Sequence, residues 1–229
     1  MRSIWRTLTP AHRRDVLALG GAILVVGTSF GAIAVAAGLA WWVPTALSVL
    51  VFAGGSQFLV VGVLAAGGGV LAAVAGALLL NARHLPFGLA IGHVVGGSRW
   101  ARLLGSHLLV DESVAFALAQ RDPRHARAVF WASGLTMFVA WNLGTVVGVL
   151  AGQVIGDPDV LGLDAAFPAG LLALVLPALR DARARGAALL GAAVALATTP
   201  FLPPGVPVLL ALTGLLALLP APTRKEVHA

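Results

Sequence analysis

The chain has 229 residues, of which 59% are hydrophobic and 10% charged, whereas a typical soluble domain carries about 25% charged residues. This apolar surface exceeds what a water-soluble core can bury, so the composition indicates a polytopic membrane protein. The net charge of +6 comes with no cysteine, which excludes disulfides and cysteine metal sites. Because the basic residues cluster between apolar segments, they indicate membrane orientation and not nucleic-acid binding.

The N-terminal segment 1–15 is rich in arginine and precedes a long apolar run. Uncharged sequence extends from Val16 to Pro44, which is much longer than the roughly 7 to 15 apolar residues of a signal peptide. We therefore expect a first transmembrane helix that is retained. Segment 1–15 is expected in the cytoplasm, where positive charge accumulates.

Apolar segments that could form membrane helices recur along the whole chain. They fall at 16–40, 45–66, 69–93, 127–152, 165–180, 186–201 and 205–220, with an ambiguous eighth candidate at 103–120. Glycine and proline clusters separate many of them. The sequence predicts an all-α fold, with one integral membrane domain over 1–229. This domain would be a polytopic helix bundle of about eight transmembrane segments, some of them interrupted.

The charges of the loops predict the direction of each segment. Two arginine clusters and the tail 221–229 are expected in the cytoplasm. The first cluster is Arg121, Arg124 and Arg127, and the second is Arg180, Arg183 and Arg185. Loop 153–164 has three aspartates and no base, so it is expected outside. This alternation requires 103–120 to cross the membrane, which leaves Arg99 and Arg102 outside. Alternatively, 103–120 lies flat on the inner surface and one earlier segment is re-entrant.

Glycines at four-residue spacing occur in several of the segments. They are Gly27 and Gly31; Gly88, Gly92 and Gly96; and Gly144, Gly148 and Gly152. Small residues at this spacing let helices approach closely in lipid. A chain with 28 glycines also produces some such spacings by chance.

The first stretch with chemical potential is FAGGSQF, residues 52–58, in the middle of an apolar segment. Gly54 and Gly55 weaken the helix, and Ser56 and Gln57 place a hydroxyl and an amide at membrane depth. Interrupted helices of this kind form transporter substrate sites, where free N–H groups receive a carboxylate. The alternative is interhelical packing with polar hydrogen bonds.

The second stretch is NARHLPFG, residues 81–88. An arginine at the centre of a membrane helix costs about 2.5–3.5 kcal/mol, and Asn81 and His84 add to the cost of Arg83. The segment must therefore face protein or a water-filled cavity, and Pro86 frees backbone carbonyls at similar depth. The alternative is an arginine that extends to the membrane surface.

The third stretch is HLLVDESVAF, residues 107–116. Two acids cost roughly 5–7 kcal/mol at the bilayer centre, so the segment lies at the surface or inserts only against a partner, for which Arg83 is the natural candidate. His107 lies one turn from Asp111 and could also pair with it. Asp111 or Glu112 could carry a proton; the alternative is a solvated charge on a surface helix.

No other cluster in the sequence indicates an enzyme. The histidines show no metal-ligand spacing, and no nucleophile with its base, phosphate loop or dinucleotide fingerprint is present. We therefore expect no catalytic residues, no metal and no cofactor. Trp141 and Asn142 are expected to make interhelical hydrogen bonds.

With these motifs in view, the chain resembles the AzlC family, the larger subunit of bacterial branched-chain amino acid exporters. The resemblance rests on SVLVFAGGSQF (48–58), LLLNARHLPFG (78–88) and DESVAF (111–116), whereas the later half matches mainly in hydropathy and in FPAGLLALVLPAL. Family motifs often have tyrosine where Phe87 stands, so that hydroxyl is missing here. The resemblance implies a multi-pass protein of the bacterial inner membrane with both termini cytoplasmic.

The resemblance also implies a function and a partner. Members typically work with a small AzlD-type membrane subunit and export leucine, isoleucine, valine or related apolar amino acids. We expect a secondary transporter coupled to a proton gradient; the alternative is a channel or a carrier for another small molecule. The expected substrate-binding residues are Gly54, Gly55, Ser56, Gln57, Asn81, Arg83 and His84, with Asp111 and Glu112 for proton coupling or charge balance.

Overall fold

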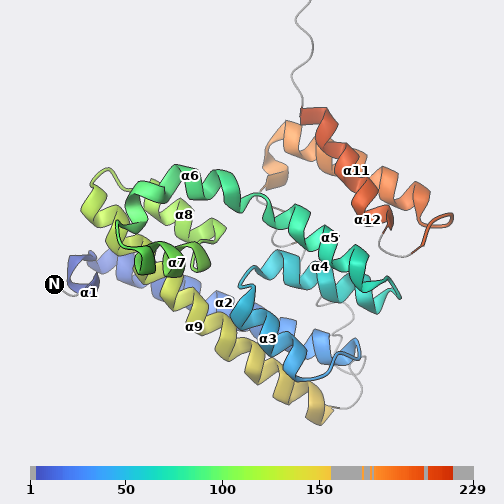
Figure 1. Ribbon diagram of the computed structural model, residues 1–229, viewed down its shortest axis with the longest axis horizontal. Helices are drawn as coiled ribbons and strands as arrows, with labels where there is room; N and C mark the ends of the chain where they lie inside the picture. The colour runs from blue at the N-terminus through green and yellow to red at the C-terminus, as the bar shows by residue number, and fades with distance from the viewer. Residues whose placement is uncertain (1–3, 156–171, 173–175, 177, 204–205, 219–229) are drawn as a thin grey trace, which may run out of the picture.

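The computed structural model describes residues 4–155, 172, 176, 178–203 and 206–218, and within these ranges every regular element is a helix (Figure 1). The predicted all-α class is confirmed. Two long helices, α2 (Pro10–Ala36) and α9 (Pro123–Ile155), lie side by side along the molecule. A short α1 (Ile4–Thr7) packs against the start of α9.

Helices α2 and α9 run in the same direction and touch through backbone. The contacting pairs rise in number on both helices: Gly20 with Thr136, Gly27 with Trp141, Gly31 with Thr145, and Ala32 with Gly152. A Cβ added at Gly31, Gly144 or Gly148 would strike backbone atoms of the other helix. The predicted close packing is therefore confirmed for the glycines of these two helices. Gly92, in contrast, faces open space.

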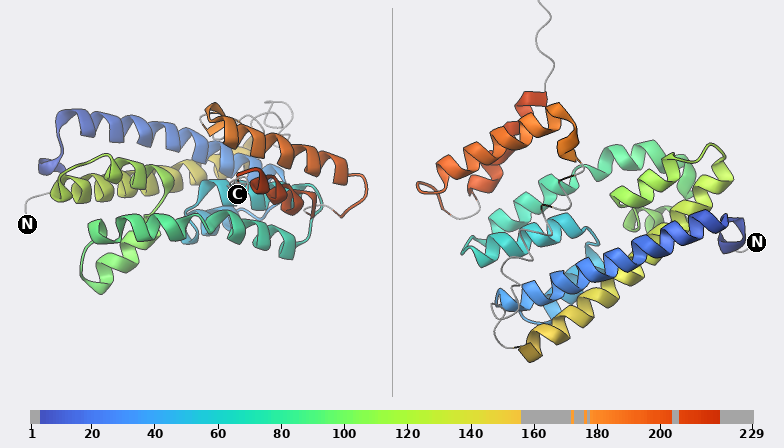
Figure 2. Two further views of the ribbon diagram at one scale, coloured as in Figure 1. Left: turned by 90° about the horizontal axis from the view of Figure 1, so that it is seen from above. Right: turned by 180° about the vertical axis from the view of Figure 1, so that it is seen from behind.

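The segment predicted to cross at 45–66 consists of two short helices, α3 (Trp42–Leu50) and α4 (Gly54–Ala65). Helix α3 runs back along α9, since Ser48 bonds Asn142 and Phe52 packs on Phe138, four residues earlier in α9. Helix α4 then reverses, so that the pair forms a hairpin (Figures 1 and 2). We refer to it as the α3–α4 hairpin.

Helices α5 (Val70–Asn81) and α6 (His84–Val95) form one apolar segment that is bent by 42°. The segment runs opposite to α2 and α9 (Figures 1 and 2). It ends near the start of α9, because the indole of Trp131 donates to the carbonyl of Val95 at 3.2 Å. The predicted segment 69–93 is thus found as a bent pair.

The segment predicted at 103–120 also consists of two short helices, α7 (Arg99–His107) and α8 (Asp111–Leu118), which form the α7–α8 hairpin. The break has a physical cause. Two acids open α8, where the helix dipole favours negative charge, and the Ser113 hydroxyl accepts from the backbone N–H of Val110 at 3.0 Å. The single continuous helix that a crossing segment over 103–120 requires is therefore not found.

The remaining helices are η2 (Ala178–Arg180), α11 (Ala182–Thr198), α12 (Val206–Leu210) and η3 (Ala211–Leu218). Helix α11 packs antiparallel on η3, with Gly191 against Ala211 and Gly214 against Ala187. Helix α12 lies beside α5, where Leu209 approaches Gly76. Most of the predicted segment 165–180, most of the predicted loop 153–164 and the whole tail 221–229 lie outside the described residues.

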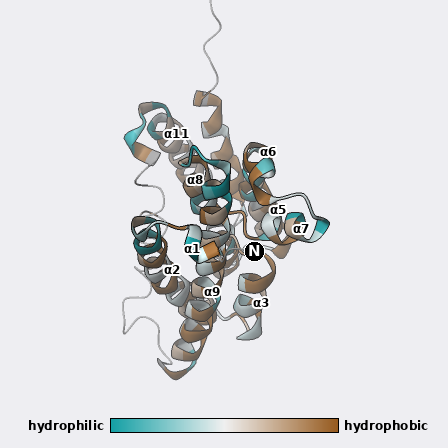
Figure 3. Ribbon diagram, turned by 90° about the vertical axis from the view of Figure 1, so that its left-hand side faces the viewer, coloured by the Kyte–Doolittle hydropathy of each residue, from teal (hydrophilic) through white to brown (hydrophobic). Residues whose placement is uncertain are grey.

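Among the described residues, α2 and α9 are long and apolar enough to cross a membrane, and α5 with α6 is a third candidate. Large apolar side chains cover the outside, for example Leu71, Leu89 and Val154, each at least 84% exposed. The hydrophilic residues gather at the end that faces the viewer in Figure 3, around α1, the start of α2 and α7. The structure therefore supports a multi-span helical membrane protein, whereas eight spans are not shown.

Candidate functional site

A cavity of about 520 Å³ lies where three helix breaks meet. The breaks separate α3 from α4, α5 from α6, and α7 from α8, and each contributes lining residues. Helices α2 and α9 close the cavity from the other side. The three stretches singled out in the sequence are therefore brought together in space, although they extend from residue 52 to residue 116.

The break between α3 and α4 supplies backbone groups. Phe52 has a φ of 42°, which is uncommon for a residue other than glycine, and Gly54 and Gly55 line the cavity. A Cβ at Gly54 would lie 3.0 Å from the Trp141 ring, so this glycine permits the close approach. No side chain in the described part of the chain caps the N-terminus of α4, which leaves its first N–H groups available to an anion.

Ser56 and Gln57 stand next to these glycines but do not line the cavity. Each is 1% exposed. The Ser56 hydroxyl donates to the carbonyl of Ala53 at 2.9 Å. The Gln57 amide donates to the carbonyl of Leu47 at 2.7 Å and accepts from the Trp141 indole at 2.9 Å. These bonds hold the shape of the break and tie it to α9. The predicted interhelical bond of Trp141 is confirmed, and Asn142 accepts from Ser48 at 2.7 Å.

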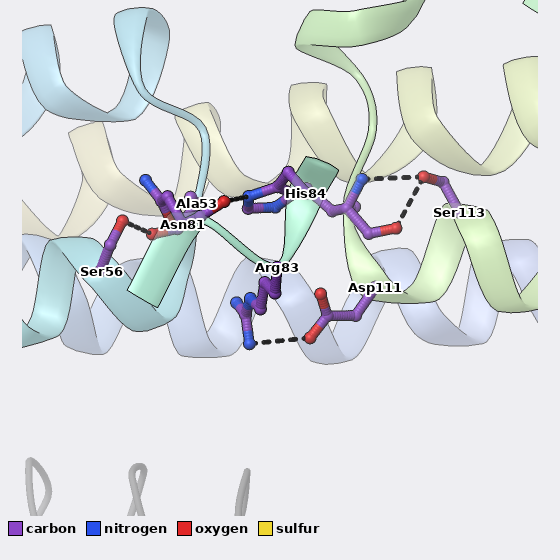
Figure 4. A network of polar contacts seen from close by, with 8 residues as sticks. Ala53, Ser56, Asn81, Arg83, His84, Asp111 and Ser113 are labelled. Atoms are coloured by element: carbon purple, nitrogen blue, oxygen red, sulfur yellow. Dashed lines mark hydrogen bonds and ion pairs between the residues drawn. The ribbon is translucent and has the colours of Figure 1, made fainter. Parts of the chain in front are cut away.

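The break between α5 and α6 supplies Arg83 and His84, which both line the cavity. The Arg83 guanidinium lies 3.0 Å from the Asp111 carboxylate at the start of α8 (Figure 4). The predicted pairing of these two residues is therefore confirmed. The His84 ring contacts the backbone carbonyl of Asn81 at 2.9 Å. Asn81 itself is not among the lining residues.

The break between α7 and α8 supplies Asp111 and Glu112, which also line the cavity. His107 bonds the carbonyl of Val49 at 2.8 Å, so the alternative pairing of His107 with Asp111 is wrong. Arg83 Nε and Asp111 Oδ1 are buried atoms without a hydrogen-bond partner among the described residues. Buried polar atoms are normally satisfied, whereas this ion pair keeps one unpaired donor and one unpaired acceptor among the described residues.

The rest of the cavity wall is apolar. It includes side chains from α2, α4, α9 and α12, namely Ile23, Val26, Phe58, Met137, Trp141 and Val208. Sequence reasoning did not find these residues, because they resemble every other apolar residue of the chain. Charged groups on one side and hydrocarbon on the other suit a small molecule with both kinds of surface.

Comparisons with known proteins agree with this membrane architecture. A family model described as AzlC protein matches residues 18–155. The match covers α2 from its ninth residue and continues to the end of α9. A Haemophilus influenzae protein described as an uncharacterized membrane protein is 26% identical over 180 residues, which cover 76% of this chain and 72% of the Haemophilus protein. A Helicobacter pylori protein of the same description is 26% identical over 57% of this chain and 58% of its own. No solved structure matches the chain.

Proposed function

The chain belongs to the AzlC family, and we propose that it is a secondary transporter that exports branched-chain or related apolar amino acids. Export would be coupled to a proton gradient and would take place across the bacterial inner membrane, with both termini in the cytoplasm. A small AzlD-type membrane subunit would be its partner. The observation that carries the proposal is the cavity with charged groups on one side and an apolar wall on the other.

Each part of an apolar amino acid has a counterpart in this cavity. The carboxylate would bind the Arg83 guanidinium together with the free N–H groups at Gly54 and Gly55, since a Cβ at Gly55 would lie 3.5 Å from that guanidinium. The ammonium would bind the carboxylates of Asp111 and Glu112. The aliphatic side chain would lie on the wall of α2 and α9, where its burial contributes about 0.8 kcal/mol per methylene.

The remaining predicted residues would act indirectly. Ser56 and Gln57 are used in internal hydrogen bonds, so we assign them the positioning of Gly54 and Gly55. Asn81 would position His84 through its carbonyl. Asp111 and Glu112 would also carry or balance the coupling proton, because an acid that lines a membrane cavity can exchange protons with either side.

Counterflow in proteoliposomes tests the proposal. The chain, with and without the adjacent small subunit, would be reconstituted with internal unlabelled leucine and external labelled amino acids. We expect saturable, stereoselective uptake that is inhibited by isoleucine and valine, and that is weaker with raised KM in Arg83→Lys because lysine lacks the two-pronged donor. Flux that does not saturate would indicate a channel instead. Saturable uptake of a different solute with no leucine exchange would indicate another carrier.

A further inference from the structure

The α3–α4 hairpin and the α7–α8 hairpin have the same construction. Each consists of two short helices of 8 to 12 residues with a break of three residues at the tip. We propose that both are re-entrant hairpins, which enter the membrane from opposite faces and meet at the cavity. This path of the chain through the membrane does not depend on which substrate is transported.

Helix lengths show that these segments are too short to cross. At about 1.5 Å per residue, the nine residues of α3 and of α7 span about 14 Å, and the twelve of α4 about 18 Å. The hydrocarbon core is about 30 Å thick. Each hairpin therefore reaches about halfway and returns to the face from which it came.

The α3–α4 hairpin enters from the end of the molecule where α2 finishes. Helix α2 ends at Ala36, and after residues 37–41 helix α3 begins at Trp42 and runs back along α9. Helix α4 returns to the same end, where the turn 66–69 leads into α5 (Figures 1 and 2). Because α2 starts at the cytoplasmic arginines, this end faces outward and the turn around Gly69 lies outside.

The α7–α8 hairpin enters from the opposite end. Helix α6 finishes beside the start of α9, where Trp131 bonds Val95 and Gly96 packs against Arg127. Helix α7 starts there and α8 returns to the same end, directly before α9 (Figure 1). Arg99 and Arg102 consequently lie on the cytoplasmic side, as basic residues prefer. The eight-span arrangement instead places these two arginines outside.

The two tips touch each other at the middle of the molecule. His107 at the tip of one hairpin bonds the carbonyl of Val49 at the tip of the other, at 2.8 Å. The ring of Phe138 on α9 packs against both Phe52 and His107, with centroid distances of 5.1 and 5.5 Å. Behind the tips, Gly54 and Asp111 open onto the cavity. The α3–α4 hairpin thus stands between the cavity and the outer face, and the α7–α8 hairpin between the cavity and the inner face.

Thiol labelling in native membranes tests this arrangement, because the chain has no cysteine and each single substitution gives a unique thiol. Four positions would be used: Ala40→Cys, Gly69→Cys, Gly97→Cys and Ala119→Cys, all of them exposed. At Gly69 and Gly97 a Cβ meets no atom of the described residues within 4 Å, so both substitutions leave their packing intact. A membrane-impermeant maleimide is applied to right-side-out spheroplasts and to inverted vesicles.

Gly69→Cys and Gly97→Cys decide between the two arrangements. We expect labelling of Gly69→Cys only from outside and of Gly97→Cys only from inside, whereas eight crossing helices require the reverse at both positions. Ala40→Cys (outside) and Ala119→Cys (inside) are the same in both arrangements and serve as controls for sidedness. Reversed or two-sided labelling at Gly69 or Gly97, or labelling of either only after denaturation, overturns the proposal. The readout needs no substrate, so its failure is distinguishable from failure of the transport proposal.

Discussion

The ion pair between Arg83 and Asp111 permits a quantitative prediction. Removal of one partner leaves the other charge alone in a cavity bounded by hydrocarbon. At their separation of 3.0 Å, Coulomb's law gives about 5.5 kcal/mol for an effective dielectric constant of about 20 and about 1.4 kcal/mol in water. The two side chains are 36% and 44% exposed, so solvent screens part of this energy. We expect Arg83→Ala to lower the free energy of unfolding by about 2–3 kcal/mol.

A double substitution separates the role in stability from the role in binding. Asp111→Asn in the Arg83→Ala background removes the stranded charge, so we expect the free energy of unfolding to return to within about 1 kcal/mol of the parent. Transport should not return with it, because the guanidinium that would bind the substrate carboxylate is still missing. Arg121→Ala, an exposed arginine in the turn before α9, is the matched control.

Thermal unfolding of a fluorescent fusion in detergent measures the change in stability of each variant. A loss of 2–3 kcal/mol corresponds to a decrease in Tm of about 4–12 °C for a chain of this size. Leucine efflux, normalised to membrane abundance, measures the binding term. The reasoning is refuted if Arg83→Ala unfolds at the parent temperature and transports normally, or if the double variant is as unstable as the single one.

Three further predictions concern the scaffold. Gly148→Ala drives a methyl group into the Thr28 carbonyl and should cost about 1–3 kcal/mol of stability, measured as a lower Tm. Gly21→Ala, whose methyl group meets no described atom within 4 Å, should leave Tm unchanged; equal effects would contradict the packing. Gln57→Leu removes the acceptor of the buried Trp141 indole, at a cost of about 1–3 kcal/mol, whereas the Leu47 carbonyl keeps its bond from the backbone N–H of Val51. Efflux per molecule should fall although Gln57 does not line the cavity; unchanged Tm and efflux would remove its positioning role. The hydrogen bond from His125 lowers the pKa of Asp122 below its ordinary value of 3.8. The stability that the Asp122 carboxylate contributes is therefore present above pH 3.8 and is lost as the pH falls through the lowered pKa. Asp122→Asn should reduce the slope of Tm against pH below about 4, and an unchanged slope would argue against this contribution.

The polar part of the site was predictable from the sequence because charge in hydrocarbon is expensive. Arg83 and Asp111 each need a partner at membrane depth, and each was the natural candidate for the other. The glycines of α2 and α9 were predictable for a similar reason, since their spacing on a helix places them on one face. In both cases a short stretch of sequence permits few arrangements of its side chains within a membrane.

The reversal of the chain between α3 and α4 was not predictable in the same way. Hydropathy averaged over 45–66 is the same for one crossing helix and for two short helices that reverse. The reversal depends on the backbone at Phe52, whose positive φ no residue preference indicates. Gln57 shows a second limit, because a buried amide can bind a ligand or hold a loop, and only the positions of Leu47 and Trp141 distinguish the two.

The parallel packing of α2 and α9 has a consequence for biosynthesis. Helix α2 ends at Ala36, whereas the helix that covers its glycine face is complete only at Ile155. At about 5–20 residues per second, the ribosome needs roughly 6–24 seconds to make the chain between these points. During that interval the glycine face of α2 is covered by lipid or by the insertion machinery. Assembly of the bundle therefore follows the arrival of α9, and a nascent chain that stalls before it exposes a helix surface suited to unrelated membrane proteins.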